Sequence, residues 1–351
     1  MSRRAAWTAV CVLAVGAALA PVPQRWIELW YSRGIYPAIQ RVLTTISNVS
    51  PYPLFDLLCL AAVAAMAVAT YRAVRARGWT RGSLHAVATL VCSAAIVYLV
   101  FLATWGLNYR RLPLTAKLDF DAARIMRPSA GDLAAETVRS LNQLYAAAHR
   151  GETDLAHLAT AFHSAERALS ASARTATDNE WSGTVLGRPK STLLGGYFHY
   201  TAVAGMTDPF FLETLLASDL LDVERPFVIA HEWGHLAGYA DESEANYIAW
   251  LTCLRGDERA QYSAWLALLG TVQPFLPKAG GPVLDIGPRI DVYAIRYRYT
   301  RTSPVLRAAA RETYDRYLKA NRVERGIESY GAVLQLILGT QRDAAGNPRL
   351  R

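Results

Sequence analysis

The sequence predicts an α+β protein in which three N-terminal transmembrane helices precede a mostly helical domain with a small β-sheet. Three observations support this class. The first 105 residues contain three long apolar runs, two later stretches place apolar residues at helical spacing, and one stretch has glycine and proline between short β-prone segments. We therefore expect a membrane anchor over residues 1–105 and a separate domain over residues 106–351.

The anchor is predicted from the length of its apolar runs, which cover residues 6–23, 53–70 and 84–105. Each run approaches the roughly 20 residues that a helix needs to cross the hydrocarbon core of a bilayer. The first run alone would also suit a secretory signal peptide. The two runs that follow it favour a multi-pass anchor in the lipid bilayer.

The arginines predict which side each end of the anchor faces. The link between the second and third runs has no acidic residue and contains Arg72, Arg75, Arg77 and Arg81. Arg3 and Arg4 precede the first run. The positive-inside rule then places the N-terminus in the cytoplasm and residues 106–351 outside it, at a plasma (inner) membrane.

The segment between the first two runs, residues 24–52, is expected to be an outer loop whose aromatic residues suit a membrane interface. Asp56 lies near the outer end of the second run. We expect it to cap that helix or to reach toward the headgroups, although an acidic residue in a membrane segment also allows a functional role.

Charge and cysteine content exclude several classes of protein. The net charge of +8 comes from 37 Lys+Arg against 29 Asp+Glu, and the arginines are scattered along the chain. We therefore expect no nucleic-acid partner. Three of the four cysteines lie in the apolar runs, which leaves Cys253 alone in the rest of the chain. The outer domain thus has neither a disulfide framework nor a cysteine metal site.

The outer domain is expected to begin with helices over residues 130–150 and 153–173, where apolar residues recur every three or four positions. Residues 183–218 are expected to form strands and turns, with YFHYTAV (197–203) as a strand. Helices are expected again from about 224 to 270. A glycine- and proline-rich loop over 277–288 then precedes two final helices.

A metal-binding motif occupies residues 231–235, which read HEWGH. Residues four apart share one face of a helix, so His231 and His235 are expected to bind one Zn²⁺ through nitrogens at about 2.0–2.1 Å. Glu232 is the expected catalytic residue, which takes a proton from zinc-activated water and passes it to the leaving amine. The apolar lead-in over 227–230 predicts a buried helix, where these side chains would be costly without a metal. Gly238 is placed to end that helix.

The third metal ligand is expected from the next helix. Asp241 is suited to cap its N-terminus and Glu244 to occupy the capping-box position, which leaves Glu242 free to face the metal. We favour Glu242 over Glu244, and both over Asp241. Asn246 lies four residues after Glu242, on the same helix face, and is expected to hold a histidine ring in position from the second shell.

These residues resemble gluzincin-type metallopeptidases. HEWGH followed by ESEANYIAWL (242–251) is similar to their pattern, in which a second motif runs Glu-x-x-Ala-Asp/Asn. The resemblance implies that Glu242 is the ligand and Asn246 the second-shell residue. Asn246 replaces the more common Asp, so the second shell carries one charge less. The interval between His235 and Glu242 is also short, with room for one tight turn.

A second resemblance covers nearly the whole chain. The three apolar runs, WGLNYRR (105–111), GMTDPFFLE (205–213), the HEWGH motif and TYDRYLKANRVERGIESYG (313–331) look like a bacterial family catalogued as domain of unknown function thirty-eight ten. The resemblance implies a membrane-anchored zincin-like protein and no particular substrate.

Other residues are candidates for supporting roles. The segment YFHYTAVAGMTDPFFLETLL (197–216) lies just before the zinc-binding motif, where a zincin edge strand pairs with extended substrate; an ordinary core strand is the alternative. His199, within it, is expected to be a core or surface residue. One further side chain could stabilise the oxyanion that forms during hydrolysis. Four residues are candidates, although residues of these types at helical spacing more commonly serve packing: Tyr314, Tyr317, Asn321 and Tyr330.

The prediction is therefore a membrane-anchored zinc metallopeptidase acting on a peptide or protein substrate. One alternative is a zinc-binding membrane sensor or interaction module without catalysis. The intact Glu232 argues against it, because a structural site needs no base. A second alternative is a zinc amidase acting on cell-wall peptides, which the sequence does not separate from proteolysis.

Overall fold

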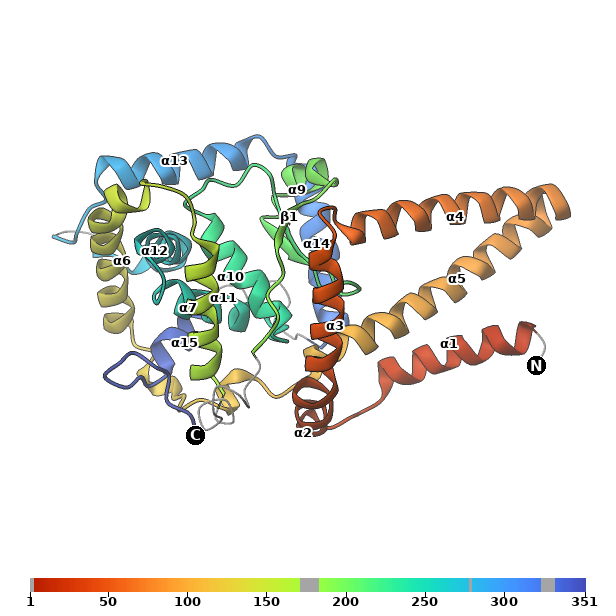
Figure 1. Ribbon diagram of the computed structural model, residues 1–351, viewed down its shortest axis with the longest axis horizontal. Coiled ribbons are helices and arrows are strands. Elements are labelled where there is room, and N and C mark those ends of the chain that lie inside the picture. Colours follow the sequence, from red (N-terminus) through yellow and green to blue (C-terminus); the bar gives the residue numbers. More distant parts are fainter. Residues whose placement is uncertain (1–2, 171–182, 278–279, 323–331) are drawn as a thin grey trace.

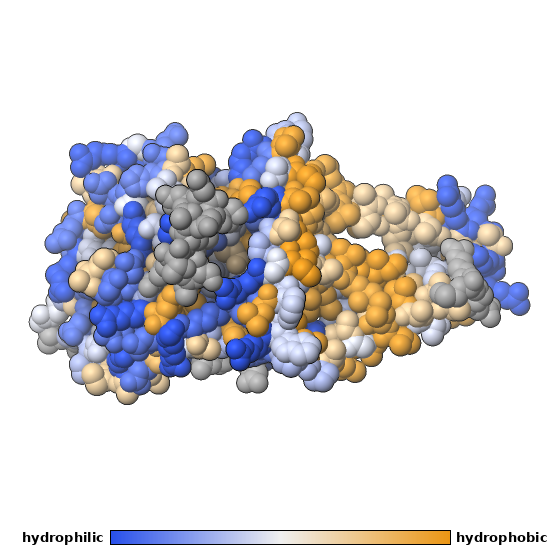
Figure 2. Space-filling model, turned by 60° about the horizontal axis from the view of Figure 1, so that its bottom comes forward, coloured by the Kyte–Doolittle hydropathy of each residue, from blue (hydrophilic) through white to orange (hydrophobic). Residues whose placement is uncertain are grey.

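The computed structural model describes residues 3–170, 183–277, 280–322 and 332–351. These residues form a wide, mostly helical part and a slender part made of three helices that project from one flank (Figure 1). The slender part is strongly hydrophobic, and the wide part is largely hydrophilic away from that flank (Figure 2). The predicted combination of apolar N-terminal helices with a mostly helical domain and a small sheet is confirmed at this level.

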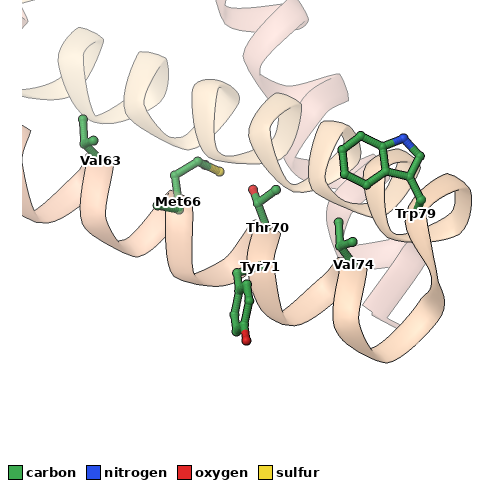
Figure 3. Close-up of a pocket in the computed structure, with 7 residues that line it drawn as sticks. Val63, Met66, Thr70, Tyr71, Val74 and Trp79 are labelled. Atoms are coloured by element: carbon green, nitrogen blue, oxygen red, sulfur yellow. The ribbon is translucent and has the colours of Figure 1, made fainter.

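Two helices of the slender part are long and apolar enough to cross a membrane, α4 (Leu54–Arg77) and α5 (Trp79–Thr104). They form a hairpin that turns at Gly78, which has a φ of +75°, a left-handed conformation that favours glycine. Near the turn, an apolar groove runs along the hairpin between residues such as Val63, Met66 and Trp79 (Figure 3).

The predicted third crossing helix is less clear than these two. The first apolar run forms α1 (Arg3–Leu19), which has only 17 residues. At about 1.5 Å per residue, this helix is shorter than the roughly 30 Å hydrocarbon core. Together with the following helical segment, α1 passes the same test only as a pair bent by 106°. Pro21 and Pro23 in the break prevent a continuous helix there.

The segment expected to be an outer loop is helical over most of its length. It contains α2 (Gln24–Trp26), the π-helix η1 (Ile27–Ile35) and α3 (Tyr36–Val49). We call these three consecutive segments, residues 24–49, the arm helix. The arm helix lies across the flank from which α1, α4 and α5 project (Figure 1). Three of its residues, Ile27, Tyr31 and Tyr36, belong to the hydrophobic core of the wide part.

The first two helices of the wide part match their predictions closely. They are α6 (Arg127–Ala148) and α7 (Leu155–Ala168). The apolar residues that predicted α6 include Leu133, Val138 and Leu141, which are buried. Asp154 caps α7 by accepting hydrogen bonds from the N–H groups of residues 156 and 157.

The predicted strand over 197–203 is wrong, because residues 197–201 belong to helix α9 (Gly195–Thr201) and residues 202 and 203 follow it without forming a strand. The aromatic residues there suggested a strand, but they follow helical periodicity: Phe198 and Thr201 are buried, whereas Tyr197 and Tyr200 are exposed. Tertiary burial of one helix face thus overrides local propensity.

The strands are β1 (Pro189–Ser191), β2 (Gly205–Thr207) and β3 (Thr214–Leu216), in the order β1-β3-β2. β1 pairs with β3 in parallel, and β2 pairs with β3 antiparallel. β2 therefore lies at an edge of this small sheet and packs against α10.

The centre of the wide part is built from α10 (Arg225–Leu236), α11 (Glu242–Cys253) and α12 (Glu258–Val272). α10 and α11 cross closely at Gly234, where an added Cβ would lie 2.6 Å from Cγ2 of Ile248. The remaining elements are η2 (Gly106–Arg110), η3 (Leu114–Ala116), η4 (Ala122–Arg124), η5 (Gln273–Phe275), α13 (Ile286–Thr300), α14 (Pro304–Ala320) and α15 (Val333–Gly339). Two final helices were predicted, whereas the described residues after 280 form three: α13, α14 and α15.

Candidate metal centre

Helix α10 carries both histidines of the motif on one face. The ring centroids of His231 and His235 are 4.6 Å apart. As predicted, the helix ends at Gly238, whose φ is +81°. The N–H of Gly238 donates to the carbonyl of His235, and the N–H of Tyr239 donates to the carbonyl of Gly234. This is a Schellman ending, and it turns the chain directly toward α11.

Helix α11 begins at Glu242 and brings its carboxylate to the two rings. Asp241 caps the helix by accepting a hydrogen bond from the N–H of Ser243. Glu242 Oε2 lies 3.2 Å from Nε2 of His231 and 3.5 Å from Nε2 of His235. Ligands at about 2.0–2.1 Å from one tetrahedral ion are separated by about 3.3–3.4 Å. These separations therefore fit a shared metal ion.

The same three residues form a group whose candidate ligand atoms all lie within 4.8 Å of one another. Among the described residues, no other histidine, cysteine or acidic side chain joins the group. Glu242 Oε2 is also the only buried carboxylate oxygen in the described part of the chain that makes no hydrogen bond. A buried charged oxygen needs a positive partner, and a divalent cation among the three ligands supplies one.

Hydrogen bonds hold both rings with Nε2 toward this point. Nδ1 of His231 lies 2.9 Å from Oδ1 of Asn246, so Asn246 contacts a histidine ring as expected. Nδ1 of His235 lies 2.7 Å from the carbonyl oxygen of Tyr239. With Nδ1–H donating in each case, Nε2 keeps its lone pair for a metal.

Glu232 lies beside the group and is held from β2. Its Oε2 accepts a hydrogen bond of 2.9 Å from the hydroxyl of Thr207. Gly205 leaves room for the other oxygen, because a Cβ there would lie 2.7 Å from Glu232 Oε1. Burial raises the pKa of Glu232, and the nearby His231, His235 and Thr207 only partly oppose this effect. A raised pKa brings a carboxylate closer to the range of a general base that works near neutral pH.

The two charged partners in the centre shift each other's pKa. Burial by itself would lower the pKa of His235, but the carboxylate of Glu242 outweighs burial and raises it to about 9. The pKa of Glu242 is lowered, because the interactions with His235 and His231 exceed the opposing effect of burial. Both shifts have the same cause: a buried carboxylate that draws positive charge toward the imidazoles.

The alternatives for the third ligand have other roles in the structure. The carboxylate of Glu244 accepts a hydrogen bond from the backbone N–H of Leu114, and Asp241 serves as the helix cap. Nδ1 of His199 lies 2.7 Å from Oδ2 of Asp219, and His199 does not join the metal group. Asp56 is buried and accepts hydrogen bonds from Thr192 and Leu193.

The four candidates for oxyanion contact differ in position. The hydroxyl of Tyr314 donates to Glu242 Oε1, so this side chain reaches the centre from α14. Tyr317 packs its ring against Tyr109, with centroids 5.8 Å apart. Asn321 donates to the carbonyl of Tyr317 at the end of the same helix. Tyr330 lies outside the described residues.

The comparisons with known proteins identify a family. A family model with the description "Protein of unknown function (DUF3810)" matches residues 31–338. The chain belongs to this family. No curated protein matches it, and no solved structure does. The matched range includes the motif on α10, Glu242 on α11 and Tyr314 on α14.

Two residues of this DUF3810 protein contact the centre without having been predicted from the sequence. Thr207 orients Glu232, as described above, and the indole Nε1 of Trp105 donates to the carbonyl of His235 at 3.0 Å. A polar residue close before the motif was the only signal for Thr207. Trp105 belongs to WGLNYRR, and nothing in that segment indicated a contact with the centre.

Proposed function

We propose that this chain is a membrane-anchored, zinc-dependent metallopeptidase with a zincin-like outer domain. The observation that carries the proposal is the convergence of His231, His235 and Glu242 on one point, with Glu232 directly beside them. A structural zinc site has four protein ligands, whereas a catalytic site has three and an open position. The group has three members among the described residues, which favours catalysis.

Zinc is the metal that we infer, since two histidines and one carboxylate are a common catalytic zinc set. His231, His235 and Glu242 would hold the ion. Asn246 and the carbonyl of Tyr239 fix the two rings, and Tyr314 steadies the second oxygen of Glu242. When bound, zinc supplies a Lewis acid that polarises a carbonyl group and lowers the pKa of water.

The acid–base work falls to Glu232. In its charged form the carboxylate accepts a proton from the attacking water, and in its neutral form it passes that proton to the leaving amine. Thr207 keeps the carboxylate in one orientation through both steps. β2 lies at the sheet edge beside α10, where an extended peptide can add as a further strand.

We also propose a multi-pass position in a plasma (inner) membrane, with the N-terminus in the cytoplasm and the wide part outside. The N-terminal end of α1 and the α4–α5 turn lie together at the far end of the slender part (Figure 1). This end carries the arginine-rich link, which favours the cytoplasmic side. In this arrangement α1, α4 and α5 each cross the bilayer.

The central test replaces Glu232 by Gln in the full-length protein, purified in lipid nanodiscs. We expect one zinc per chain in both forms, measured by elemental analysis. Hydrolysis of a mixed peptide pool should fall by about a hundredfold to ten-thousandfold in Glu232→Gln, the range for loss of a general acid–base. Equal hydrolysis by both forms would rule out the mechanism.

The same experiment separates the alternatives. Stoichiometric zinc without hydrolysis of any peptide pool would favour the sensor or interaction module. Cleavage restricted to cell-wall peptides, and lost in Glu232→Gln, would favour the amidase.

A further inference from the structure

The arm helix has an inverted arrangement of polar and apolar side chains. In α3, the face turned to the protein is largely polar: Tyr36, Gln40, Thr44 and Ser47 are all buried. On the opposite face, the exposed fractions of Val42, Ile46 and Val49 are 57%, 53% and 82%. In a helix that faces water, these two faces would be exchanged.

The exposed apolar stripe continues toward the N-terminal end of the arm helix, where the buried face is mixed and includes Ile27 and Tyr31. Trp26, Leu29, Trp30 and Ile35 are exposed, whereas Glu28 is buried and paired with Arg111 and Lys117. Tryptophan is enriched where a membrane meets water. The apolar stripe therefore runs along the whole arm helix.

The exposed stripe is continuous with the helices that enter the membrane. The arm helix crosses the flank from which α1, α4 and α5 emerge (Figure 1), and hydrophobic atoms spread from the slender part onto that flank (Figure 2). Leu193 and Tyr197, at the start of α9, are also exposed, and the N–H of Leu193 donates to Asp56 in the first turn of α4. A bilayer around α4 and α5 would meet all of these residues.

The polar face of the arm helix excludes a position deep in the hydrocarbon. Gln40 donates to the carbonyl of Val185 at 2.7 Å, Thr44 to that of Leu212 at 3.0 Å, and Asn48 to that of Leu186 at 2.9 Å. These acceptors belong to loops of the wide part. The arm helix is thus fixed to that part by one face and has the other face free for lipid, as in helices that lie in a membrane interface.

Three contacts connect this flank to the metal centre. Tyr36 donates to the carbonyl of Leu236 in the last turn of α10. Arg111 joins Glu28 of the arm helix to the carbonyl of Gly238, just after α10. Trp105, the first residue after α5, donates to the carbonyl of His235 itself. The ligand His235 is therefore one side chain away from the end of a membrane helix.

We propose that the arm helix lies in the surface of the bilayer crossed by α4 and α5, and that it holds the metal centre at this surface to act on membrane-attached polypeptides. The part concerning substrates rests on the proposed function. The part concerning the bilayer does not.

The bilayer contact is tested with the full-length protein in nanodiscs that contain a diazirine phosphatidylcholine. After illumination, mass spectrometry should find lipid adducts on residues 24–49 as well as on α4 and α5. The first half of α13, which includes the exposed Ile286 and Ile290, is an internal control, because α13 begins at the end of the wide part that is farther from the slender part (Figure 1). Adducts on α4 and α5 but not on residues 24–49 would overturn the proposal.

A matched pair of variants tests the consequence for substrates. Val42→Lys/Ile46→Lys changes the proposed lipid face, and Ile290→Lys makes the same kind of change on α13. The measurement is the ratio of cleavage rates for a peptide pool with a palmitoyl anchor and the same pool without it. We expect the ratio to fall at least tenfold in Val42→Lys/Ile46→Lys and to be unchanged in Ile290→Lys.

The outcomes distinguish the two proposals. An unchanged ratio in Val42→Lys/Ile46→Lys, with adducts present on the native arm helix, would overturn the substrate class and leave the metallopeptidase intact. No cleavage of either pool by the native protein would count against the proposed function, while the lipid adducts would still decide the position of the arm helix.

Discussion

The metal centre and the inner face of α3 both bury polar side chains, and they differ in how those side chains are satisfied. On α3, Gln40, Thr44 and Asn48 each donate to a backbone carbonyl of a neighbouring loop. In the centre, Oε2 of Glu242 is buried without a hydrogen bond and faces two imidazole nitrogens.

This difference indicates what each region is for. A fully paired polar face costs little to bury and specifies how two elements dock. A buried carboxylate oxygen without a hydrogen bond is costly unless a cation joins it, and this is why we propose a metal ion at Glu242. The comparison predicts that changes in the centre alter metal content and turnover, whereas changes to the buried polar side chains of α3 alter stability alone.

The largest effect is expected for Glu242→Ala. Loss of the only carboxylate in the group should reduce zinc from one per chain to nearly none after dialysis, with loss of hydrolysis. The matched control is Glu244→Gln, whose side chain contacts Leu114 and not the metal group. If Glu242→Ala retained zinc and Glu244→Gln lost it, Glu244 and not Glu242 would be the third metal ligand.

Gly205→Ala tests the position of the general base. The new Cβ would lie 2.7 Å from Glu232 Oε1, so the carboxylate must move. Since misplacement of a catalytic group by about 1 Å can cost about a hundredfold, we expect turnover to fall by about tenfold to a hundredfold. Zinc content should stay at one per chain, because Glu232 is not a ligand. Gly196→Ala is the control, since nothing lies within 4 Å of its added Cβ.

Asn246→Ala tests the hydrogen bond that holds the ring of His231. The variant removes the partner of Nδ1 of His231, which frees the ring to change tautomer and to rotate. Loss of such a partner weakens metal affinity by about tenfold to a hundredfold. Competition with a fluorescent zinc chelator would measure it. Asn246→Asp should keep or increase the affinity, and a weaker affinity in that variant would contradict the assigned contact.

The convergence of His231, His235 and Glu242 could be predicted from the sequence because it depends on local geometry. Spacing of four residues on α10, a left-handed glycine at 238 and a cap at Asp241 determine how His231, His235 and Glu242 meet. All of these signals lie within a dozen residues. The contacts of Thr207 and Trp105 depend instead on how distant segments pack, and periodicity carries no information on this.

The same distinction explains the errors in the fold. Residues 24–49 seemed to be a loop because their apolar positions do not form one continuous run, and their polar positions find partners up to 200 residues away, as Tyr36 does with Leu236. Residues 197–201 are aromatic and β-prone, yet burial of Phe198 and Thr201 makes them a helix. Long-range packing decided both cases.

Gln40→Ala is expected to have the smallest effect, and it tests the other side of the comparison. Gln40 bonds both the carbonyl and the N–H of Val185, at 2.7 and 3.2 Å. Loss of these bonds should cost about 1–3 kcal/mol of folding free energy, or a few degrees in the Tm of the wide part. Zinc content and turnover should not change, because no metal ligand loses a partner. Thermal unfolding in nanodiscs, followed together with zinc release, measures both quantities. If Gln40→Ala loses zinc well below its unfolding temperature, the arm helix supports the metal centre directly, and the division between docking and ligand-binding polar groups does not hold.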